Sequence, residues 1–410
     1  MVYNNYIDTK PNEGTVFPIM DKVSVLLVGI GGYGQTYVNH ILDGNDPRIT
    51  VAGLVDPYPQ SCARLAEFTG AGVKLYDSME DFFADGGQAQ LAVISSPIQF
   101  HTPQILLALQ HGMHVLCEKP LCGDARDIEV LQKAANEACK YVGIGFQWSH
   151  NRAILALKRD VMDGRFGKAH DLRALVLWPR DAKYYARGIG WAGKKATPDG
   201  KLIYDSVINN ATAHYLHNIF FVLGGDGTAA MPQSIKAELY RANPIENFDT
   251  AKVDMTFEGG AQAHMLAAHA VDQTINPIFE YRFEEGIACF AMNDTSDTRA
   301  LMPDWYTAYG HIQAKFSDGS TVDYGDPFHD QCSKLTMAVD AVLSGETFAV
   351  CGITTAAVHT RVIDYIQNHF DIVDFAPDEL RKKELLTYAE GLAQRMITAY
   401  KTPAKRIGRE

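Results

Sequence analysis

The 410-residue sequence predicts an α/β protein of two domains: a doubly wound parallel sheet, then an α/β domain with a large open, mostly antiparallel sheet. Three observations predict this class. Short β-branched runs alternate with helical stretches from residue 23 to 146, and a glycine-rich turn follows the first run. After residue 147 the pattern changes to closely spaced alternating segments. The length also exceeds what one hydrophobic core usually holds.

In the first domain we expect six strands joined by helices, the arrangement of right-handed βαβ units. The expected strands span residues 23–28, 50–55, 73–76, 91–95, 113–117 and 141–146. The expected helices span residues 33–43, 59–69, 78–84, 103–111 and 124–139. Thr102 followed by Pro103 predicts a helix start with threonine as its N-cap, and Gly112 predicts that helix's end.

The second domain begins with an amphipathic pattern and continues with strands separated by turn residues. Strands are expected at residues 169–178, 236–241, 251–257, 262–270, 278–283, 287–292 and 311–316. Helices are expected at residues 151–163, 207–223, 329–343, 353–370 and 378–399, before a frayed tail at 402–410. We therefore place the domains at 1–148, including an N-terminal arm at 1–21, and at 149–410.

The composition excludes several classes of partner. A formal charge of −12 would repel nucleic acid and anionic membrane surfaces. Seven scattered cysteines without paired ligand spacing indicate reduced thiols in a cytoplasm, and no cluster of His, Cys and Asp has the spacing of a metal site. Helices on one face of an antiparallel sheet would leave the other face free, so we expect a homo-oligomer, a dimer or a tetramer.

The turn after the first strand reads Gly29-Ile30-Gly31-Gly32-Tyr33-Gly34. The first glycine of this G-x-G-x-x-G pattern permits a tight turn, the second lets backbone N–H groups approach a pyrophosphate, and the third lets the helix pack close to the strand. Asp56 ends the second strand, where a carboxylate can bind both ribose hydroxyls of NAD. An acid there disfavours the 2′-phosphate of NADP, although Arg64 is a nearby cation. The alternative is a glycine-rich turn that binds no phosphate.

Ligands of parallel sheets bind beyond the carboxyl ends of the strands, so the loops that follow strands 91–95 and 113–117 matter most. Glu118-Lys119-Pro120 places an acid, an amine and a rigid imino acid at the second of these strand ends. A partly desolvated lysine near a positively charged nicotinamide can accept a hydroxyl proton near neutral pH. Glu118 would bind the cofactor's ribose or orient the lysine, and a cis bond before Pro120 is an option. The alternative is a surface Glu–Lys pair. The first loop adds four cofactor-side residues, Ser95, Ser96, Pro97 and His101.

Taken together, these motifs resemble the glucose-fructose oxidoreductase, inositol dehydrogenase and rhizopine catabolism (Gfo/Idh/MocA) family. The similar segments are Gly29-x-Gly31-x-x-Gly34, Ser96-Pro97-x-x-x-His101, residues 108–121 around Glu118-Lys119-Pro120, and Gly164-x-x-Gly167-Lys168. The resemblance implies a Rossmann domain, a second α/β domain whose open sheet makes subunit contacts, and NAD(P)-dependent chemistry on sugar or polyol hydroxyls. It also implies a proton-transfer role for Lys119.

The family's second catalytic motif, D-x-G-x-H-x-x-D, corresponds to residues 210–217 here. His214 takes the histidine position and can exchange a proton at physiological pH. Asn210 replaces the first acid and His217 the second, and we expect Asn210 to hydrogen-bond a substrate hydroxyl. On a helix, positions 210, 214 and 217 would share one face and line one pocket.

Further polar and aromatic residues follow the last strand of the first domain. Gln147 is assigned to the cofactor, and Trp148, Arg152, Tyr184, Tyr185, Arg187 and Trp191 to the substrate. Aromatic faces with charged donors suit a hydroxylated ring, and arginines, including Arg180, could admit a carboxylate or phosphate. The alternative is a solvated loop whose tyrosines pack on their own scaffold.

From these residues and the resemblance we expect a cytoplasmic NAD-dependent oxidoreductase, with NADP less favoured. It would transfer a hydride between nicotinamide and a hydroxyl-bearing carbon of a sugar, polyol or sugar derivative. Two alternatives stay open: an NAD-assisted glycoside hydrolase, which would release no net NADH, and a non-catalytic regulator that senses NAD and sugar on the same fold.

Overall fold

The computed structural model describes residues 22–187 and 190–408, so the expected arm at 1–21 lies outside it. The chain divides into two compact units. The first contains the chain up to Leu121, then Arg126–Ala156 and Asp330–Ile353, and the second contains the remainder. The boundary at residue 148 stays a prediction, while the assignment of 330–353 to the first unit is a feature that the sequence pattern did not indicate.

The first unit is built on a six-stranded parallel sheet in the order β3-β2-β1-β4-β5-β6. Its strands are β1 (Val23–Val28), β2 (Ile49–Val55), β3 (Leu75–Tyr76), β4 (Leu91–Ile94), β5 (His114–Cys117) and β6 (Val142–Ile144). Strands β4 and β5 are buried along their whole length, as expected for parallel strands covered on both faces. This order confirms the predicted doubly wound sheet.

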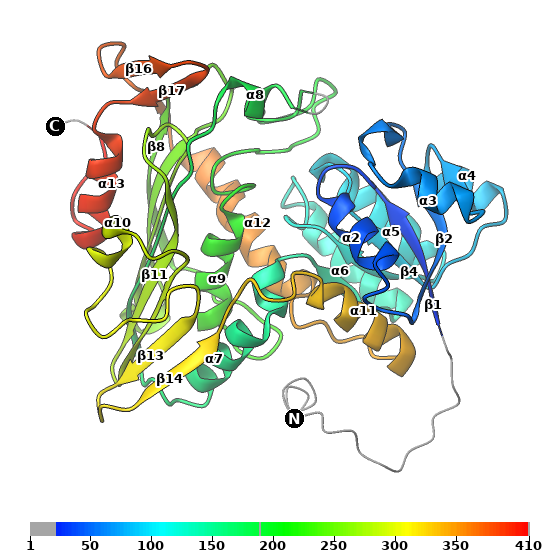
Figure 1. Ribbon diagram of the computed structural model, residues 1–410, viewed down its shortest axis with the longest axis horizontal. Helices are drawn as coiled ribbons and strands as arrows, with labels where there is room; N and C mark the ends of the chain where they lie inside the picture. The colour runs from blue at the N-terminus through cyan, green and yellow to red at the C-terminus, as the bar shows by residue number, and fades with distance from the viewer. Residues whose placement is uncertain (1–21, 188–189, 409–410) are drawn as a thin grey trace. The chain divides into compact units, whose positions relative to one another are not determined.

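Helices connect these strands (Figure 1). They are α2 (Gly34–Leu42), α3 (Leu65–Gly70), α4 (Met79–Ala84), α5 (His101–Gln110) and α6 (Asp127–Ala138), with short 3-10 turns at Pro59–Ser61, Ile98–Phe100 and Gln147–His150. The predicted cap of α5 is wrong: the helix begins at His101, and the Thr102 hydroxyl donates to Asp127 of α6 at 2.8 Å instead. A helix from far along the chain, α11 (Ser333–Ser344), packs Leu335 and Val339 into the apolar cluster around β1.

The second unit is built on a nine-stranded sheet in the order β14-β13-β12-β11-β7-β10-β9-β8-β15. Its strands are β7 (Ala169–Leu177), β8 (Ser234–Arg241), β9 (Thr250–Thr256), β10 (Gln262–Ala268), β11 (Ile275–Phe283), β12 (Gly286–Ala291), β13 (Ile312–Phe316), β14 (Thr321–Gly325) and β15 (Ile372–Asp374). Pairs β7/β10 and β8/β15 are parallel and the remaining pairs antiparallel, so the prediction of a mostly antiparallel sheet is confirmed. The amphipathic helix α7 (Arg152–Met162) precedes β7.

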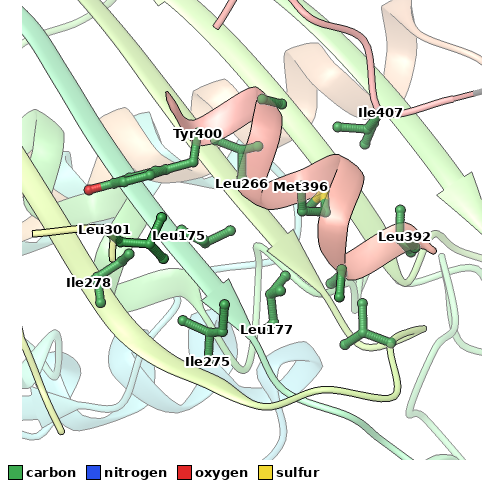
Figure 2. Packing of buried hydrophobic residues seen from close by; sticks show 14 of the residues in the cluster. Leu175, Leu177, Leu266, Ile275, Ile278, Leu301, Leu392, Met396, Tyr400 and Ile407 are labelled. Atoms are coloured by element: carbon green, nitrogen blue, oxygen red, sulfur yellow. The ribbon is translucent and has the colours of Figure 1, made fainter. Parts of the chain in front are cut away.

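Helices cover this sheet on both faces (Figure 1). On one face lie α9 (Ala213–Leu223) and α12 (Ile353–His369), and the Asn218 amide of α9 donates to the Tyr281 hydroxyl of β11 at 3.0 Å. On the other face, α13 (Leu392–Lys401) and the loop around α10 (Ser296–Arg299) bury the apolar residues that alternate with that tyrosine (Figure 2). The expectation that this second face is left free is therefore wrong where α13 covers it.

The C-terminal segment differs most from prediction. The first part of the expected helix at 378–399 is a β-hairpin, β16 (Leu380–Lys383) and β17 (Leu386–Ala389), which turns at Glu384 with a φ of 53°. The expected frayed tail at 402–410 is wrong at Ile407, which is buried in the same cluster as α13 and whose N–H donates to Glu238 at 3.2 Å; residues 409–410 lie outside the described residues. Across the two described stretches of chain, no helix is long and apolar enough to span a membrane.

Candidate functional site

The glycine-rich turn between β1 and α2 leaves no room for side chains at two of its positions. Gly29 has a φ of 79°, and a Cβ placed on it would lie 2.7 Å from the backbone nitrogen of Ser96. A Cβ on Gly34 would lie 2.0 Å from the carbonyl oxygen of Gly29. Both positions therefore need glycine, because the backbone around the turn is packed too closely to admit a Cβ.

Asp56 lies at the carboxyl end of β2 and holds the turn. Its Oδ2 accepts hydrogen bonds from the N–H groups of Ile30 at 3.0 Å and Gly31 at 3.3 Å, and its Oδ1 accepts from Tyr58 at 2.8 Å. Arg64 is engaged elsewhere, by Glu67 at 2.7 Å and Asp43 at 2.6 Å. Asp56 is therefore the fixed charge beside the turn.

The loop after β4 is tied to the loop after β5 by His101. Its Nδ1 lies 2.8 Å from the Pro120 carbonyl oxygen and its Nε2 lies 2.9 Å from the Ser96 carbonyl oxygen. Burial lowers the pKa of His101, and a neutral ring can donate to only one of these two carbonyls. Ser96 donates to Gln104 at 2.5 Å, and Pro97 precedes the 3-10 turn at 98–100. His101 thus joins the two loops, as a residue at a helix entry can.

Ser95 in this loop has a hydroxyl that a ligand could bind. Its Oγ is buried and has no hydrogen-bond partner in the described part of the chain. The Ser95 carbonyl carbon lies 2.8 Å from where a Cβ of Gly29 would stand, so this hydroxyl belongs to the residue beside the glycine-rich turn. A buried hydroxyl without a partner fits a bound polar group.

The Lys119–Pro120 peptide bond is cis, which confirms the option raised from the sequence. Glu118 is buried and its Oε1 accepts from the Tyr37 hydroxyl at 2.6 Å and from the Lys334 ammonium. Its Oε2 lies 3.3 Å from the backbone N–H of Lys119. The charge that balances Glu118 therefore comes from Lys334, and Lys119 itself is partly buried beside this pair.

Lys334, on α11, is a site residue that sequence reasoning missed. It is fully buried, and its ammonium also donates to the Tyr33 hydroxyl at 3.1 Å. That hydroxyl donates in turn to Gln147 at 3.1 Å, so three predicted cofactor residues, Tyr33, Glu118 and Gln147, meet around one cation. Burial alone would lower the pKa of Lys334, but Glu118 and Tyr33 outweigh it and the pKa is raised. No local motif could have revealed this lysine, which is 216 residues from its partner.

In the second unit, the helix expected at 207–223 begins at Ala213, so Asn210 lies in the turns that precede it. The prediction that positions 210, 214 and 217 share one helical face is therefore wrong for Asn210. Its amide donates to the Asp205 carboxylate at 2.7 Å. His214, partly buried, stands in the first turn of α9, whereas His217 is buried against Phe221, with ring centroids 6.1 Å apart.

The aromatic loop and the start of the helical segment form a small pocket in the second unit. Its polar lining comes from Tyr184, Tyr185, Asp205, Ser206 and His269, and Phe248 and Ile245 supply apolar wall. The sequence analysis named the two tyrosines but did not single out Asp205, Ser206 or His269. The sequence does place two polar residues, Asp205 and Ser206, shortly before the motif at 210–217, and this could have indicated a site.

Two arginines lie against this pocket's aromatic wall. Arg187 is 3.6 Å from the Tyr184 ring centroid and 5.0 Å from that of Trp191. Arg180 is 5.0 Å from the Tyr184 centroid. Four predicted substrate residues, Tyr184, Tyr185, Arg187 and Trp191, are thus brought together. Two further residues assigned to the substrate, Trp148 and Arg152, belong to the first unit, where Trp148 is buried and Arg152 is exposed at the start of α7.

Known proteins are similar in sequence to part of this chain. Residues 23–146 match the family model described as an oxidoreductase family with an NAD-binding Rossmann fold. The inositol 2-dehydrogenase of Leifsonia xyli subsp. xyli is 29% identical over 187 residues, 45% of this chain and 51% of the relative. The 1,5-anhydro-D-fructose reductase of Ensifer adhaerens is 27% identical over 190 residues, 46% of this chain and 53% of the relative. The chain therefore spans about half the length of these curated relatives.

Solved structures share the fold over most of the chain. The WlbA dehydrogenase from Bordetella pertussis, in complex with NADH and UDP-GlcNAcA, has a TM-score of 0.65 at 19% identity and covers 84% of this chain and 95% of its own. The aldose-aldose oxidoreductase from Caulobacter crescentus has a TM-score of 0.65 at 18% identity and covers 84% and 96%. At these identities the similarity shows the fold, and it confirms the predicted fold class.

The first unit thus carries a Rossmann domain of the NAD-binding oxidoreductase class. Within that class, residues 23–146 match the Gfo/Idh/MocA family model, which confirms the resemblance seen in the sequence for this segment.

Proposed function

We propose that the protein is an NAD-dependent oxidoreductase that moves a hydride between nicotinamide and a hydroxyl-bearing carbon of a sugar, polyol or sugar derivative. The observation that carries this proposal is the arrangement at the carboxyl ends of β1, β2 and β5, where the glycine-rich turn, Asp56 and Glu118-Lys119-Pro120 follow strands of one parallel sheet. The named activities of the relatives, inositol 2-dehydrogenase and 1,5-anhydro-D-fructose reductase, support the same class of substrate.

The cofactor would lie against the glycine-rich turn and the loops after β4 and β5. Backbone N–H groups of the turn and the start of α2 would face the pyrophosphate, and Ser95 would offer its unpartnered hydroxyl. Asp56 would accept the ribose hydroxyls and repel a 2′-phosphate, and Arg64 is held by two carboxylates and so cannot offset that repulsion. NAD is therefore the preferred cofactor. When bound, it supplies the hydride acceptor.

Proton transfer would fall to Lys119 and His214. Lys119 follows Glu118, whose negative charge is already balanced by Lys334. Glu118 therefore stabilises the ammonium form of Lys119 less than it would in a simple Glu–Lys pair. Its amine can then accept the substrate's hydroxyl proton. His214 would assist at the start of α9, and Asn210 would hydrogen-bond a substrate hydroxyl, in place of the acid expected there.

The proposal is tested by mixing the purified protein with NAD and a panel of polyols and sugars and recording NADH absorbance. Net NADH formation with at least one compound, reduced about 100-fold or more in Lys119→Ala, is the expected result, since general-base catalysis contributes roughly 10²–10⁴-fold. Faster reduction of NAD than of NADP is also expected. A chain that binds neither NAD nor NADH would overturn the proposal, and turnover without net NADH would indicate the glycoside-cleaving alternative.

We also infer a cytoplasmic location, supported by seven cysteines that are all free thiols. Self-association stays a prediction of the family resemblance, because α13 covers part of the sheet face from which it was first argued.

A further inference from the structure

The pocket of the second unit contains buried polar atoms without partners. The Tyr185 hydroxyl, the Ser206 hydroxyl and the Nε2 of His269 are all buried and lack a hydrogen-bond partner among the residues that the structure describes. Burial of such groups is costly unless a ligand or water completes their hydrogen bonds. Three of them in one small pocket fit one bound hydroxyl group or one water molecule.

His269 defines what one of those ligand groups must be. It is 2% exposed, and its Nδ1 lies 2.8 Å from the Trp178 carbonyl oxygen, so Nδ1 carries the proton. Burial, helped by the charges of Arg180 and Arg187, lowers its pKa to about 3. The ring is therefore neutral at physiological pH and Nε2 is a hydrogen-bond acceptor, which suits a donor such as a sugar hydroxyl.

The two arginines define a second group. The Nε atoms of Arg180 and Arg187 are buried and have no partner within residues 22–187 and 190–408. Both guanidinium groups lie against the Tyr184 ring; Arg180 donates from Nη1 to the Pro179 carbonyl at 3.5 Å, and Arg187 hydrogen-bonds the Tyr184 side chain. A planar guanidinium with free donors suits the oxygens of a carboxylate or a phosphate.

The nearby acids accept hydrogen bonds from other groups. The Asp205 carboxylate accepts from the Gly193 N–H at 2.6 Å and from the Asn210 amide at 2.7 Å. The Asp249 carboxylate accepts from the Asn243 N–H and side-chain amide, both at 2.9 Å, and burial raises its pKa. The Nε donors of Arg180 and Arg187 have no partner among the described residues.

From this arrangement we propose that the substrate is an acidic sugar derivative, whose anionic group binds Arg180 and Arg187 and whose ring hydroxyl donates to His269. The inference rests on the proposed function, because it names the chemical class of that reaction's substrate. Two groups could supply the negatively charged oxygens that the arginines bind. One is a sugar carboxylate and the other is a sugar phosphate.

Binding of three ligands to the full chain in the presence of NADH, measured by calorimetry, separates these sources. The probes are glucose, glucuronate and glucose 6-phosphate, and NADH affinity is measured first and separately. Tighter binding of either acid than of glucose, by about tenfold or more, is expected for a charged hydrogen-bonded pair. Preference for glucuronate identifies a carboxylate, and preference for glucose 6-phosphate identifies a phosphate.

Variants tie this preference to the pocket. Arg187→Met and Arg180→Met should each weaken binding of the preferred acid by about 10- to 100-fold and leave glucose unchanged. Lys183→Met, which removes an exposed cation from the same loop, is the matched control and should have no effect. His269→Phe should weaken binding of all three ligands by about 2- to 10-fold, and His269→Gln, which keeps an acceptor, should weaken it less.

Equal binding of glucose and both acids, binding of neither acid, or an acid preference that survives both arginine variants would overturn the inference. NADH formation from neutral sugars alone would overturn it too, but would leave the oxidoreductase function standing. Absence of NADH binding, by contrast, would count against the proposed function itself.

Discussion

At the scale of single residues, the candidate site depends on a cation that comes from α11. Lys334 is fully buried against Glu118, Tyr33 and Tyr37, with its ammonium 4.5 Å from the Tyr33 ring centroid. Taking two charges out of water is costly, and the pair is favourable only while both partners and their hydrogen bonds are present. The Tyr37 hydroxyl donates to Glu118 and the Lys334 ammonium donates to the Tyr33 hydroxyl, so each partner of the pair has a further hydrogen bond.

Lys334→Met is expected to destabilise the protein by about 3–5 kcal/mol, because it leaves the Glu118 carboxylate buried without its counter-charge. Urea denaturation of the full chain measures this loss. Lys133→Met, at the exposed Lys133–Glu137 pair of α6, is the control and should change stability by less than about 1 kcal/mol. The double variant Lys334→Met with Glu118→Gln should recover part of the loss. A single variant as stable as its control would contradict the assignment.

Three buried histidines predict how stability depends on pH. Burial lowers the pKa of His114 and of His150 to about 4, and that of His269 to about 3. Between these values and the ordinary 6.5, the unfolded chain binds protons that the folded chain does not. Stability therefore falls on acidification below pH 6.5, by about 1.4 kcal/mol per pH unit for each histidine.

Denaturation midpoints measured from pH 7 to pH 4.5 test this dependence. His269→Gln removes one of the three groups, so its midpoint should fall less steeply with acidification than that of the wild type. Substitution of the exposed His369 is the control and should leave the slope unchanged. A midpoint independent of pH across this range would contradict the neutral state of the three histidines.

At the scale of elements, the turn from β1 to α2 is specified by sequence. Its G-x-G-x-x-G spacing, the apolar strand before it and Asp56 after β2 all lie within a short stretch, and each is a local requirement of backbone geometry. The strand expected at 23–28 is found at those residues. Local patterns succeed here because buried parallel strands need continuous apolar runs.

Gly34→Ala is expected to abolish NADH binding or weaken it more than tenfold, because a Cβ would lie 2.0 Å from the Gly29 carbonyl oxygen and would push α2 away from β1. Fluorescence titration with NADH measures the loss. Gly70→Ala is the control, since a Cβ on that helical glycine meets no atom within 4 Å. Unchanged NADH affinity in Gly34→Ala would argue that the close contact is not required for binding.

Other elements depend on their surroundings. Residues 380–389 contain strong helix formers, yet they form a hairpin in which Arg381 pairs with Glu390 and the Ala389 N–H donates to Ala270 at 3.0 Å. Contacts between distant segments override a helix propensity of a few tenths of a kcal/mol per residue, roughly, and no local pattern reports them. The same holds for residues 207–212, where the Thr212 hydroxyl donates to the Val207 carbonyl at 2.7 Å and α9 starts later.

At the scale of the whole molecule, the nine-stranded sheet is covered on its second face by the end of its own chain. Leu392, Met396 and Tyr400 of α13, with Ile407, bury Leu175 and Leu266 of the central strands (Figure 2). Arg173 of β7 donates to the carbonyls of Tyr400 and Lys401 at the helix end, at 3.2 and 3.0 Å. The apolar side chains on this face of the sheet are therefore buried by the chain itself, without a second subunit.

Met396→Ala is expected to destabilise the protein by about 2–5 kcal/mol, the range for removing a buried methionine side chain from a packed core. Thermal unfolding of the full chain measures it. Gln394→Ala, on the exposed side of the same helix, should change stability by less than about 0.5 kcal/mol. Equal effects of the two substitutions would indicate that α13 does not stabilise the sheet.

The fold class, the glycine-rich turn with Asp56 and the Glu118-Lys119-Pro120 loop could be predicted from sequence, because each follows from local spacing and from the burial that parallel strands require. The pairing of Lys334 with Glu118, the buried atoms of His269 and of two arginines that lack partners among the described residues, and the cover that α13 gives the sheet are visible only in the folded chain. These features join residues far apart in the chain, and their energy comes from contacts that exist only after the chain has folded.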